Sequence, residues 1–359
     1  MRNWETKTLV ERIVGAGALV VVALGPFVFN DYWVDTILLQ TFFVGIGAAS
    51  LIFLSAYGGM ISLAQTALMG IAGYMLGNLV SQRGIGGESK GLTLGLDPTL
   101  ALVLAIAITV VIGFVFGALA ARSFGIYFLM LTLTYAVIAT SFFGQVTQFG
   151  GFSPIAGINQ YTPPFVGDIV SNRERLYYIG LIVAIAVYVI IRYVTRTPFG
   201  MALQGIRDEP VRMASLGYAV SVHRMLAFTL GAFIASLAGV LNVWWNGQIA
   251  PGDLGLGATI ELLIVAVIGG LGRIEGAWIG AFAFIVINNY VTNWVPSGGL
   301  PVVGGRFSTV IGLVFLAIVI VSPDGLTGLW DRVWDLARRR GAPPSVQVEV
   351  AESAGTGSS

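Results

Sequence analysis

An island of charged, helix-forming residues separates two long segments of an otherwise apolar chain. Arg207, Asp208 and Glu209 follow one another there, and Arg212 stands close behind. Both signs of charge suit ion pairs with a protein surface, whereas anionic lipid would attract the arginines but not the two acids. We therefore expect this charged elbow to bind a soluble partner. The alternative is an interfacial helix that lies on the lipid headgroups.

The sequence around the elbow predicts two short helices within a loop at residues 195–222. Thr197 is a good N-cap, and Pro198 suits the first helical position. Pro210 disfavours helix at Glu209 and can itself open the second helix. Apolar side chains of the first helix recur at intervals of three and four residues and form one stripe, for which we expect the chain to offer no groove of its own. The stripe consists of Phe199, Ala202, Leu203 and Ile206.

Groups that could catalyse a reaction or bind a metal are scarce. The chain contains no cysteine and one histidine, His223, which excludes thiol chemistry, cysteine metal sites and histidine clusters. A nucleophile, base and acid cannot be assembled around that one residue. The sequence also contains no Gly-x-x-x-x-Gly-Lys-[Ser/Thr] phosphate loop, so we expect the chain itself not to hydrolyse ATP. We expect no catalytic site, metal or cofactor, and the net charge of +1 does not indicate a nucleic-acid partner.

The composition predicts an all-α polytopic membrane protein. Of 359 residues, 56% are hydrophobic and 10% are charged, against about 25% charged in soluble domains. Several apolar runs reach the roughly 20 residues that span a bilayer. The ten predicted spans are residues 11–30, 36–57, 60–80, 99–121, 125–146, 177–194, 223–246, 258–271, 276–294 and 307–321.

The distribution of positive charge predicts the orientation of these spans. With the N-terminus inside, 14 of the 19 lysines and arginines fall in cytoplasmic segments, which places both termini in the cytoplasm. Ten spans suggest two inverted halves of five. Residues 1–340 then form one transmembrane domain. Residues 341–359 are rich in Pro, Ser, Gly, Ala and Glu, and we expect them to be disordered.

A few polar side chains within or beside the spans are candidates for a translocation pathway. They are Tyr57, Gln65, Asn78 and Glu261. Glu261 is the acid placed well inside a span, where an ionisable group is expected to be functional. The alternatives are that it lies near the outer headgroups, and that the other three hydrogen-bond neighbouring helices. Arg273 and Glu275 flank a tight cytoplasmic turn, where we expect them to pair or to contact a partner.

Several stretches of the sequence carry a family resemblance, in the right order and spacing. Residues 197–209 read Thr-Pro-Phe-Gly-Met-Ala-Leu-Gln-Gly-Ile-Arg-Asp-Glu, and residues 57–65 read Tyr-Gly-Gly-Met-Ile-Ser-Leu-Ala-Gln. Residues 125–133, 214–217 and 261–272 continue the pattern. Over most of residues 45–325 the chain resembles the permease subunits of branched-chain amino-acid ABC importers, the LivM type.

The resemblance implies one half of a membrane pore in a bacterial-type plasma (inner) membrane. Its expected partners are a second, homologous permease, two cytoplasmic ATPases that hydrolyse ATP, an extracytoplasmic solute-binding protein, and membrane lipid. Residues 199–216 would be the coupling helix that enters a groove on the ATPase. The expected coupling residues are Phe199, Leu203, Ile206, Arg207, Asp208, Glu209 and Arg212.

The resemblance favours branched-chain amino acids as the solute, with urea, short amides or a sugar as alternatives. An ion-coupled secondary transporter is an alternative from another class. It should carry paired charges at mid-membrane, where this sequence offers Glu261 alone. A channel is a third possibility, and it would need no partner loop.

Overall fold

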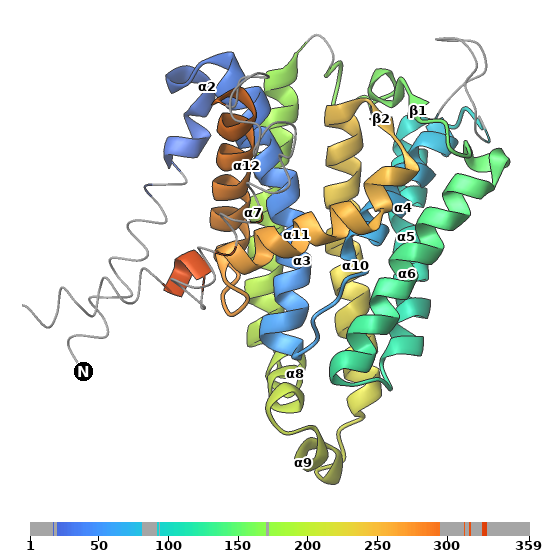
Figure 1. Ribbon diagram of the computed structural model, residues 1–359, viewed down its shortest axis with the longest axis vertical. Coiled ribbons are helices and arrows are strands. Elements are labelled where there is room, and N and C mark those ends of the chain that lie inside the picture. Colours follow the sequence, from blue (N-terminus) through green and yellow to red (C-terminus); the bar gives the residue numbers. More distant parts are fainter. Residues whose placement is uncertain are drawn as a thin grey trace, which may run out of the picture.

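The computed structural model describes residues 17, 20–80, 92, 94–169, 172–294, 312, 316 and 325–328. Most of the described residues are helical, and they form a bundle with a helical protrusion at one end (Figure 1). Of the predicted span at 11–30 the described residues are 17 and 20–30, which are helical at 17, at 20–23 and in α2 (Gly25–Val28). Of the predicted span at 307–321 only 312 and 316 are described, and the predicted tail at 341–359 lies wholly outside the described residues.

Five helices among the described residues are long and apolar enough to cross a membrane, which makes the chain a polytopic helical membrane protein. The first is a π-helical turn, η1, that continues directly into α3. Asp97 starts α5 by accepting a hydrogen bond from the Thr99 amide at 2.8 Å. The five are η1–α3 (Trp33–Leu38 and Leu39–Gly58), α5 (Pro98–Ala120), α6 (Gly125–Gln145), α7 (Arg173–Arg196) and α10 (Val220–Asn246).

The remaining elements are shorter. They are α2 (Gly25–Val28), α4 (Gln65–Val80), η2 (Thr147–Phe149), η3 (Ile158–Gln160), α8 (Pro198–Asp208), α9 (Pro210–Ser215), η4 (Pro251–Leu254), α11 (Leu256–Gly269) and α12 (Gly276–Trp294). Strand β1 (Ile155–Ala156) pairs antiparallel with β2 (Gln248–Ile249), with Ile155 opposite Ile249. The α12 and α11 helices fall on the predicted ninth and eighth spans, and α11 is short, as its flanking glycines suggested.

The predicted third span, 60–80, is wrong at its start. Gly59 adopts a left-handed conformation with φ of 62° and ends α3, as a glycine after a helix commonly does. The Met60 amide then bonds back to the Leu54 carbonyl. The chain remains non-helical until Gln65, where α4 begins. Hydropathy cannot detect this interruption, because residues 60–64 are as apolar as the helices on either side.

The core of the bundle is built around α3, which is almost wholly buried and packs against α10, α12, α7 and α11. α10 packs in turn against α4 and α5. At Gly239 of α10 an added Cβ would overlap the Met69 backbone, so α10 and α4 approach as closely as small residues allow. By contrast, α5, α6 and α7 expose apolar side chains such as Val111, Ile126 and Ile182, which suits a lipid-facing surface.

The arrangement around α3 is repeated around α10. Both helices end at a glycine with positive φ, Gly59 at 62° and Gly247 at 69°. Each is followed by a segment without α-helix and then by a shorter α-helix, α4 or α11. α5 packs on α10 and α4, while α12 packs on α3 and α11. α3 and α10 run in opposite directions, because Arg224 near the start of α10 contacts Met60, whereas Trp245 near its end contacts Asp35.

Candidate functional site

Helices α8 and α9 protrude from one end of the bundle (Figure 1) and confirm the two short helices that the sequence predicts. The Thr197 hydroxyl accepts a hydrogen bond from the Gly200 amide at 3.3 Å, and Pro198 occupies the first helical position. Glu209 leaves the helical conformation, with φ of −145° and ψ of 78°, and Pro210 opens α9. The local rules for caps and prolines therefore suffice to place both helices.

The expectation that the chain has no groove for the apolar stripe of α8 is wrong. Leu203 is 0% exposed and Ile206 is 3% exposed, since α8 packs against α3, α7 and α10. Leu203 lies over Gly58 at the end of α3. Phe199 is half-buried and stacks on His223 with ring centroids 5.6 Å apart. The stripe therefore fixes α8 to its own bundle, and in this chain Leu203 and Ile206 are not available to a partner.

The face that the two helices present outward consists of other side chains. Asp208, Glu209 and Arg212 are exposed. Among the apolar residues, Val211 is 79% exposed and Leu216 is 65% exposed. Sequence reasoning missed these two residues because it followed the stripe of α8 and did not extend the apolar pattern into α9.

Arg207 turns back toward the bundle instead of outward. Its guanidinium donates a hydrogen bond to the Ala56 carbonyl in the last turn of α3 and pairs with Asp208 at 2.8 Å. Its aliphatic stem covers Gly59, where an added Cβ would meet Arg207 Cγ. Arg207 thus joins the protruding helix to the point where α3 ends and the non-helical segment begins.

A second polar cluster ties the turn before α12 to α7. The Glu275 carboxylate pairs with Arg192 and accepts a hydrogen bond from the Tyr188 hydroxyl at 3.0 Å. Arg192 also donates to that hydroxyl at 3.2 Å. Glu275 therefore pairs within the chain, with Arg192 of α7. Tyr57, half-buried in the last turn of α3, lies with its ring 6.1 Å from that of Phe53.

Two of the predicted pathway residues are buried and hydrogen-bonded to neighbouring elements. Gln65 accepts from the Ser50 hydroxyl at 3.0 Å and donates to the Ser62 hydroxyl at 3.4 Å. Asn78 donates to the Tyr74 carbonyl at 2.9 Å and accepts from the Leu92 amide at 2.9 Å. The contact of Gln65 with Ser50 joins α4 to α3, whereas the two Asn78 contacts lie within α4 and with the segment that precedes α5.

A pocket of about 210 Å³ lies where α3, α4, α10, η4, α11 and α12 meet. Of the four predicted pathway residues, Glu261 lines this pocket, and Tyr57, Gln65 and Asn78 do not. Its other polar residues, which sequence reasoning missed, are Thr66, Asn242, Asn246 and Asp253. Its apolar residues are Phe43, Val44, Met69, Ala258, Leu262, Val265 and Phe284.

The polar groups of this pocket are only partly used within the chain. Asn246 donates to the Asn242 side-chain oxygen at 2.9 Å, and Asp253 accepts from the Ala250 amide at 2.9 Å. Thr66 is 6% exposed, yet its hydroxyl has no hydrogen-bond partner among the described residues. Within the same part of the chain no group pairs with the Glu261 carboxylate. Asn242 and Asn246 stand four residues apart near the end of α10 and so share one face of that helix. This spacing is the feature of the sequence that could have indicated the pocket.

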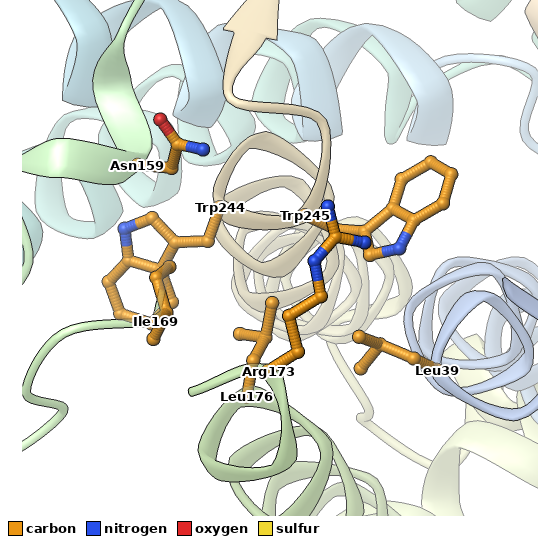
Figure 2. A pocket seen from close by; sticks show the side chains of 7 residues that line it. All are labelled: Leu39, Asn159, Ile169, Arg173, Leu176, Trp244 and Trp245. Atoms are coloured by element: carbon orange, nitrogen blue, oxygen red, sulfur yellow. The ribbon is translucent and has the colours of Figure 1, made fainter. Parts of the chain in front are cut away.

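A much smaller pocket, about 40 Å³, lies at the end of the bundle opposite α8 and α9. Figure 2 shows Arg173 extending from α7 toward Trp244 and Trp245 at the end of α10. Arg173 lies 3.8 Å from Asp35, and Trp245 donates to the Asp35 carbonyl at 3.0 Å. A space of this size is about that of one water molecule, so this pocket joins helix ends and does not hold a solute.

The fold and these sites define a class of protein. Interrupted helices that surround a polar pocket within a membrane bundle are typical of transporters. A family model described as "Branched-chain amino acid transport system / permease component" matches residues 33–322. The chain belongs to this family.

Curated relatives agree with the family. The probable branched-chain amino acid transport permease protein LivM of Methanocaldococcus jannaschii is 25% identical over 242 residues, 63% of this chain and 68% of that protein. The probable permease protein LivH of the same organism is 26% identical over 161 residues, 44% of this chain and 48% of that protein. The fructose import permease protein FrcC of Rhizobium meliloti is 26% identical over 260 residues, 71% of this chain and 68% of that protein.

The match to LivH therefore spans about half the length of that relative. No solved structure matches this chain.

Proposed function

We propose that this chain is the membrane permease subunit of an ATP-driven ABC importer and forms half of the pathway for a small polar solute. Branched-chain amino acids are the first candidate, because LivM and LivH are named for their transport. The relative FrcC is named for fructose import and supports a sugar as the second candidate. The observation that carries the proposal is the outward face of α8 and α9, which is both apolar and charged.

The proposed assembly contains a second, homologous permease, two cytoplasmic ATPases that hydrolyse ATP, and an extracytoplasmic solute-binding protein in a bacterial-type plasma membrane. Helices α8 and α9 would lie on the cytoplasmic side, together with both chain termini. The ATPase would contact the exposed face of α8 and α9. Val211 and Leu216 expose apolar surface there, which is typical of a protein interaction site. The charged residues beside them are Asp208, Glu209 and Arg212.

The repeated arrangement of α3–α4–α5 and α10–α11–α12 supports ten spans in two inverted halves. The predicted spans at 11–30 and 307–321 would complete five helices in each half. Residues 1–340 then form the permease domain, with the pocket beside Glu261 close to the contact between its halves.

Within this assembly Phe199, Leu203 and Ile206 hold α8 on the bundle. Arg207 connects α8 to the last turn of α3 through its hydrogen bond to the Ala56 carbonyl. The ATPase would thus move α8 from outside, while the inward stripe and Arg207 carry that movement into the membrane domain. Arg273 and Glu275 belong to the turn that Arg192 fixes to α7.

Co-purification of partners tests the proposal. The chain is expressed in its host with a C-terminal tag, solubilised in mild detergent and captured, and the accompanying proteins are identified by mass spectrometry. We expect an ATPase and a second permease with the wild type. The double variant Val211→Asp with Leu216→Asp should lose the ATPase but keep the permease. Phe165→Asp, an equally exposed apolar residue beyond α6, is the matched control and should keep both.

Recovery of the chain without an ATPase would contradict the importer and favour an ion-coupled transporter or a channel. Uptake of labelled leucine by the reconstituted assembly, in competition with fructose, then separates the two candidate solutes.

A further inference from the structure

The pocket between α3, α4, α10 and α11 contains polar groups that have no hydrogen-bond or ion-pair partner among the described residues, namely the Thr66 hydroxyl and the Glu261 carboxylate. We propose that it is a binding subsite for an α-amino acid, in which Glu261 takes the ammonium group while Thr66 and the first turns of α4 and α11 take the carboxylate. The inference rests on the proposed function, and it assigns to the permease itself a step of solute selection.

The size of the pocket fits such a solute. A cavity of about 150 Å³ holds one benzene molecule, and this pocket of about 210 Å³ therefore accommodates a solute a few atoms larger. Leucine, isoleucine and valine fall in that range. The pocket also has an apolar wall for a branched side chain, to which α3, α11 and α12 contribute. That wall includes Phe43, Leu262, Val265 and Phe284.

The charge of the pocket calls for a cationic group. Its two ionisable residues, Glu261 and Asp253, are both acids, and its other polar residues are neutral. Glu261 lies on the second turn of a helix that packs against α3, α4 and α12, and no described residue neutralises it. Glu261 is exposed, so its carboxylate is open to a solute that enters the pocket. An ionised carboxylate within a membrane bundle is costly unless a cation or water accompanies it. The ammonium group of an amino acid supplies a positive charge for the Glu261 carboxylate, whereas a sugar carries no charge.

The carboxylate of the solute would lie beside the N-termini of two helices, which carry partial positive charge. Thr66 lies in the first turn of α4 and Ala258 in the first turn of α11, and both line the pocket. No side chain caps the start of α11. Helix N-termini present unpaired amide groups and attract anions, and interrupted helices of transporters use them for this purpose.

Thr66 provides an independent indication that the pocket binds a polar ligand. Buried hydroxyl groups nearly always have a hydrogen-bond partner, yet the Thr66 hydroxyl has none among the described residues and belongs to a side chain that is 6% exposed. Asn246 uses one amide hydrogen on Asn242, so further donors remain beside it. A bound carboxylate satisfies these donors together.

The test uses the complete importer reconstituted in proteoliposomes and three probes: leucine, leucinamide, which keeps the ammonium but not the carboxylate, and 4-methylpentanoate, which keeps the carboxylate alone. We expect Glu261→Gln to raise the KM for leucine uptake by about tenfold, the size of a lost charge-assisted hydrogen bond. Competition by leucinamide should weaken in parallel, and competition by 4-methylpentanoate should not. Thr66→Val should show the reverse pattern between the two competitors.

Glu174→Gln is the matched control, since it removes an exposed carboxylate at the start of α7, away from the pocket, and it should leave the KM unchanged. Glu261→Asp should recover part of the uptake, which shows that the site folds. Wild-type KM values in Glu261→Gln, with leucine imported normally, would overturn the subsite and leave the importer intact. An assembly that imports fructose but not leucine would instead overturn the proposed solute and the subsite together.

Discussion

The two interruptions of the helical chain, at residues 59–64 and 247–255, follow equivalent helices but are held in different ways. In the first, the Arg207 side chain covers Gly59 and donates to the Ala56 carbonyl. In the second, the Gly247 carbonyl accepts from the Ile158 amide, and β2 pairs with β1. Other elements therefore hold the first interruption through side chains, those of Arg207 and Thr132, whereas they hold the second through backbone hydrogen bonds.

We infer from this difference that a partner bound to α8 can move residues 59–64 but not residues 247–255. Residues 59–64 connect the end of α3 to the first turn of α4, where Thr66 lines the pocket. A displacement of α8 can thus reach the pocket through Arg207 and one short segment. Residues 247–255 lead to the same pocket from the opposite end of the bundle. The pairing of β2 with β1 holds these residues in place.

The largest expected effect comes from removing the contact that distinguishes the two interruptions. Arg207→Ala leaves the Ala56 carbonyl without this charged donor, and such a hydrogen bond is worth about tenfold or more in an equilibrium. We expect leucine uptake by the reconstituted importer to fall by at least about that factor while the ATPase remains bound. Arg122→Ala, which removes an exposed arginine between α5 and α6, is the control for charge. Loss of ATPase binding in Arg207→Ala alone would mean that Arg207 contacts the partner directly.

The second prediction compares the two glycines. Gly59→Ala and Gly247→Ala each force a side chain into a left-handed conformation, at a cost of about 1–2 kcal/mol. Thermal unfolding should therefore shift by similar amounts in both variants. The Cβ at position 59 would also displace the stem of Arg207, whereas at 247 it would meet the side-chain amide of Asn159. We expect uptake to fall sharply in Gly59→Ala alone, and equal losses of uptake would remove the distinction between the interruptions.

The sequence predicted those parts of the structure that depend on neighbouring residues. Thr197, Pro198 and Pro210 place α8 and α9 because caps and prolines act within one helical turn. The burial of Leu203 could not be predicted in this way, since the surface that covers it comes from α3, α7 and α10. An apolar stripe indicates that a groove exists, but it does not indicate which chain provides it.

The pocket was harder to predict for the same reason. Glu261 was visible because an acid within an apolar run is conspicuous. Thr66 is far from it in the sequence, and Asn242 and Asp253 belong to other elements, so these residues line one pocket only through the packing of six elements. Gln65 and Thr66 are adjacent and equally polar. The start of α4 decides that Gln65 bonds to Ser50 while Thr66 lines the pocket.

A third, smaller effect concerns the inside of the first interruption. The Leu63 amide donates to the Thr132 hydroxyl of α6 at 3.1 Å, and Thr132→Val would leave that buried amide unpaired at a cost of about 1–3 kcal/mol. We expect a lower midpoint of thermal unfolding and a moderate loss of uptake, with Thr132→Ser close to the wild type. Thr109→Val, which removes a hydroxyl that bonds within α5, is the control. An equal loss of uptake in that variant would show that residues 59–64 have no special role.

The smallest effect is expected for Asp208, and it separates two explanations of Arg207. Both partners of the Arg207–Asp208 pair are substantially exposed, and exposed ion pairs contribute little. If Arg207 acts through the Ala56 carbonyl, Asp208→Asn should change uptake by less than about fivefold. A rise in ionic strength should weaken ATPase binding in the wild type more than in the variant. If Arg207 instead acts through the charge of the elbow, Asp208→Asn should reproduce the full loss caused by Arg207→Ala. The two variants measured side by side, for uptake and for bound ATPase, therefore decide whether the partner's movement enters the membrane domain at the end of α3.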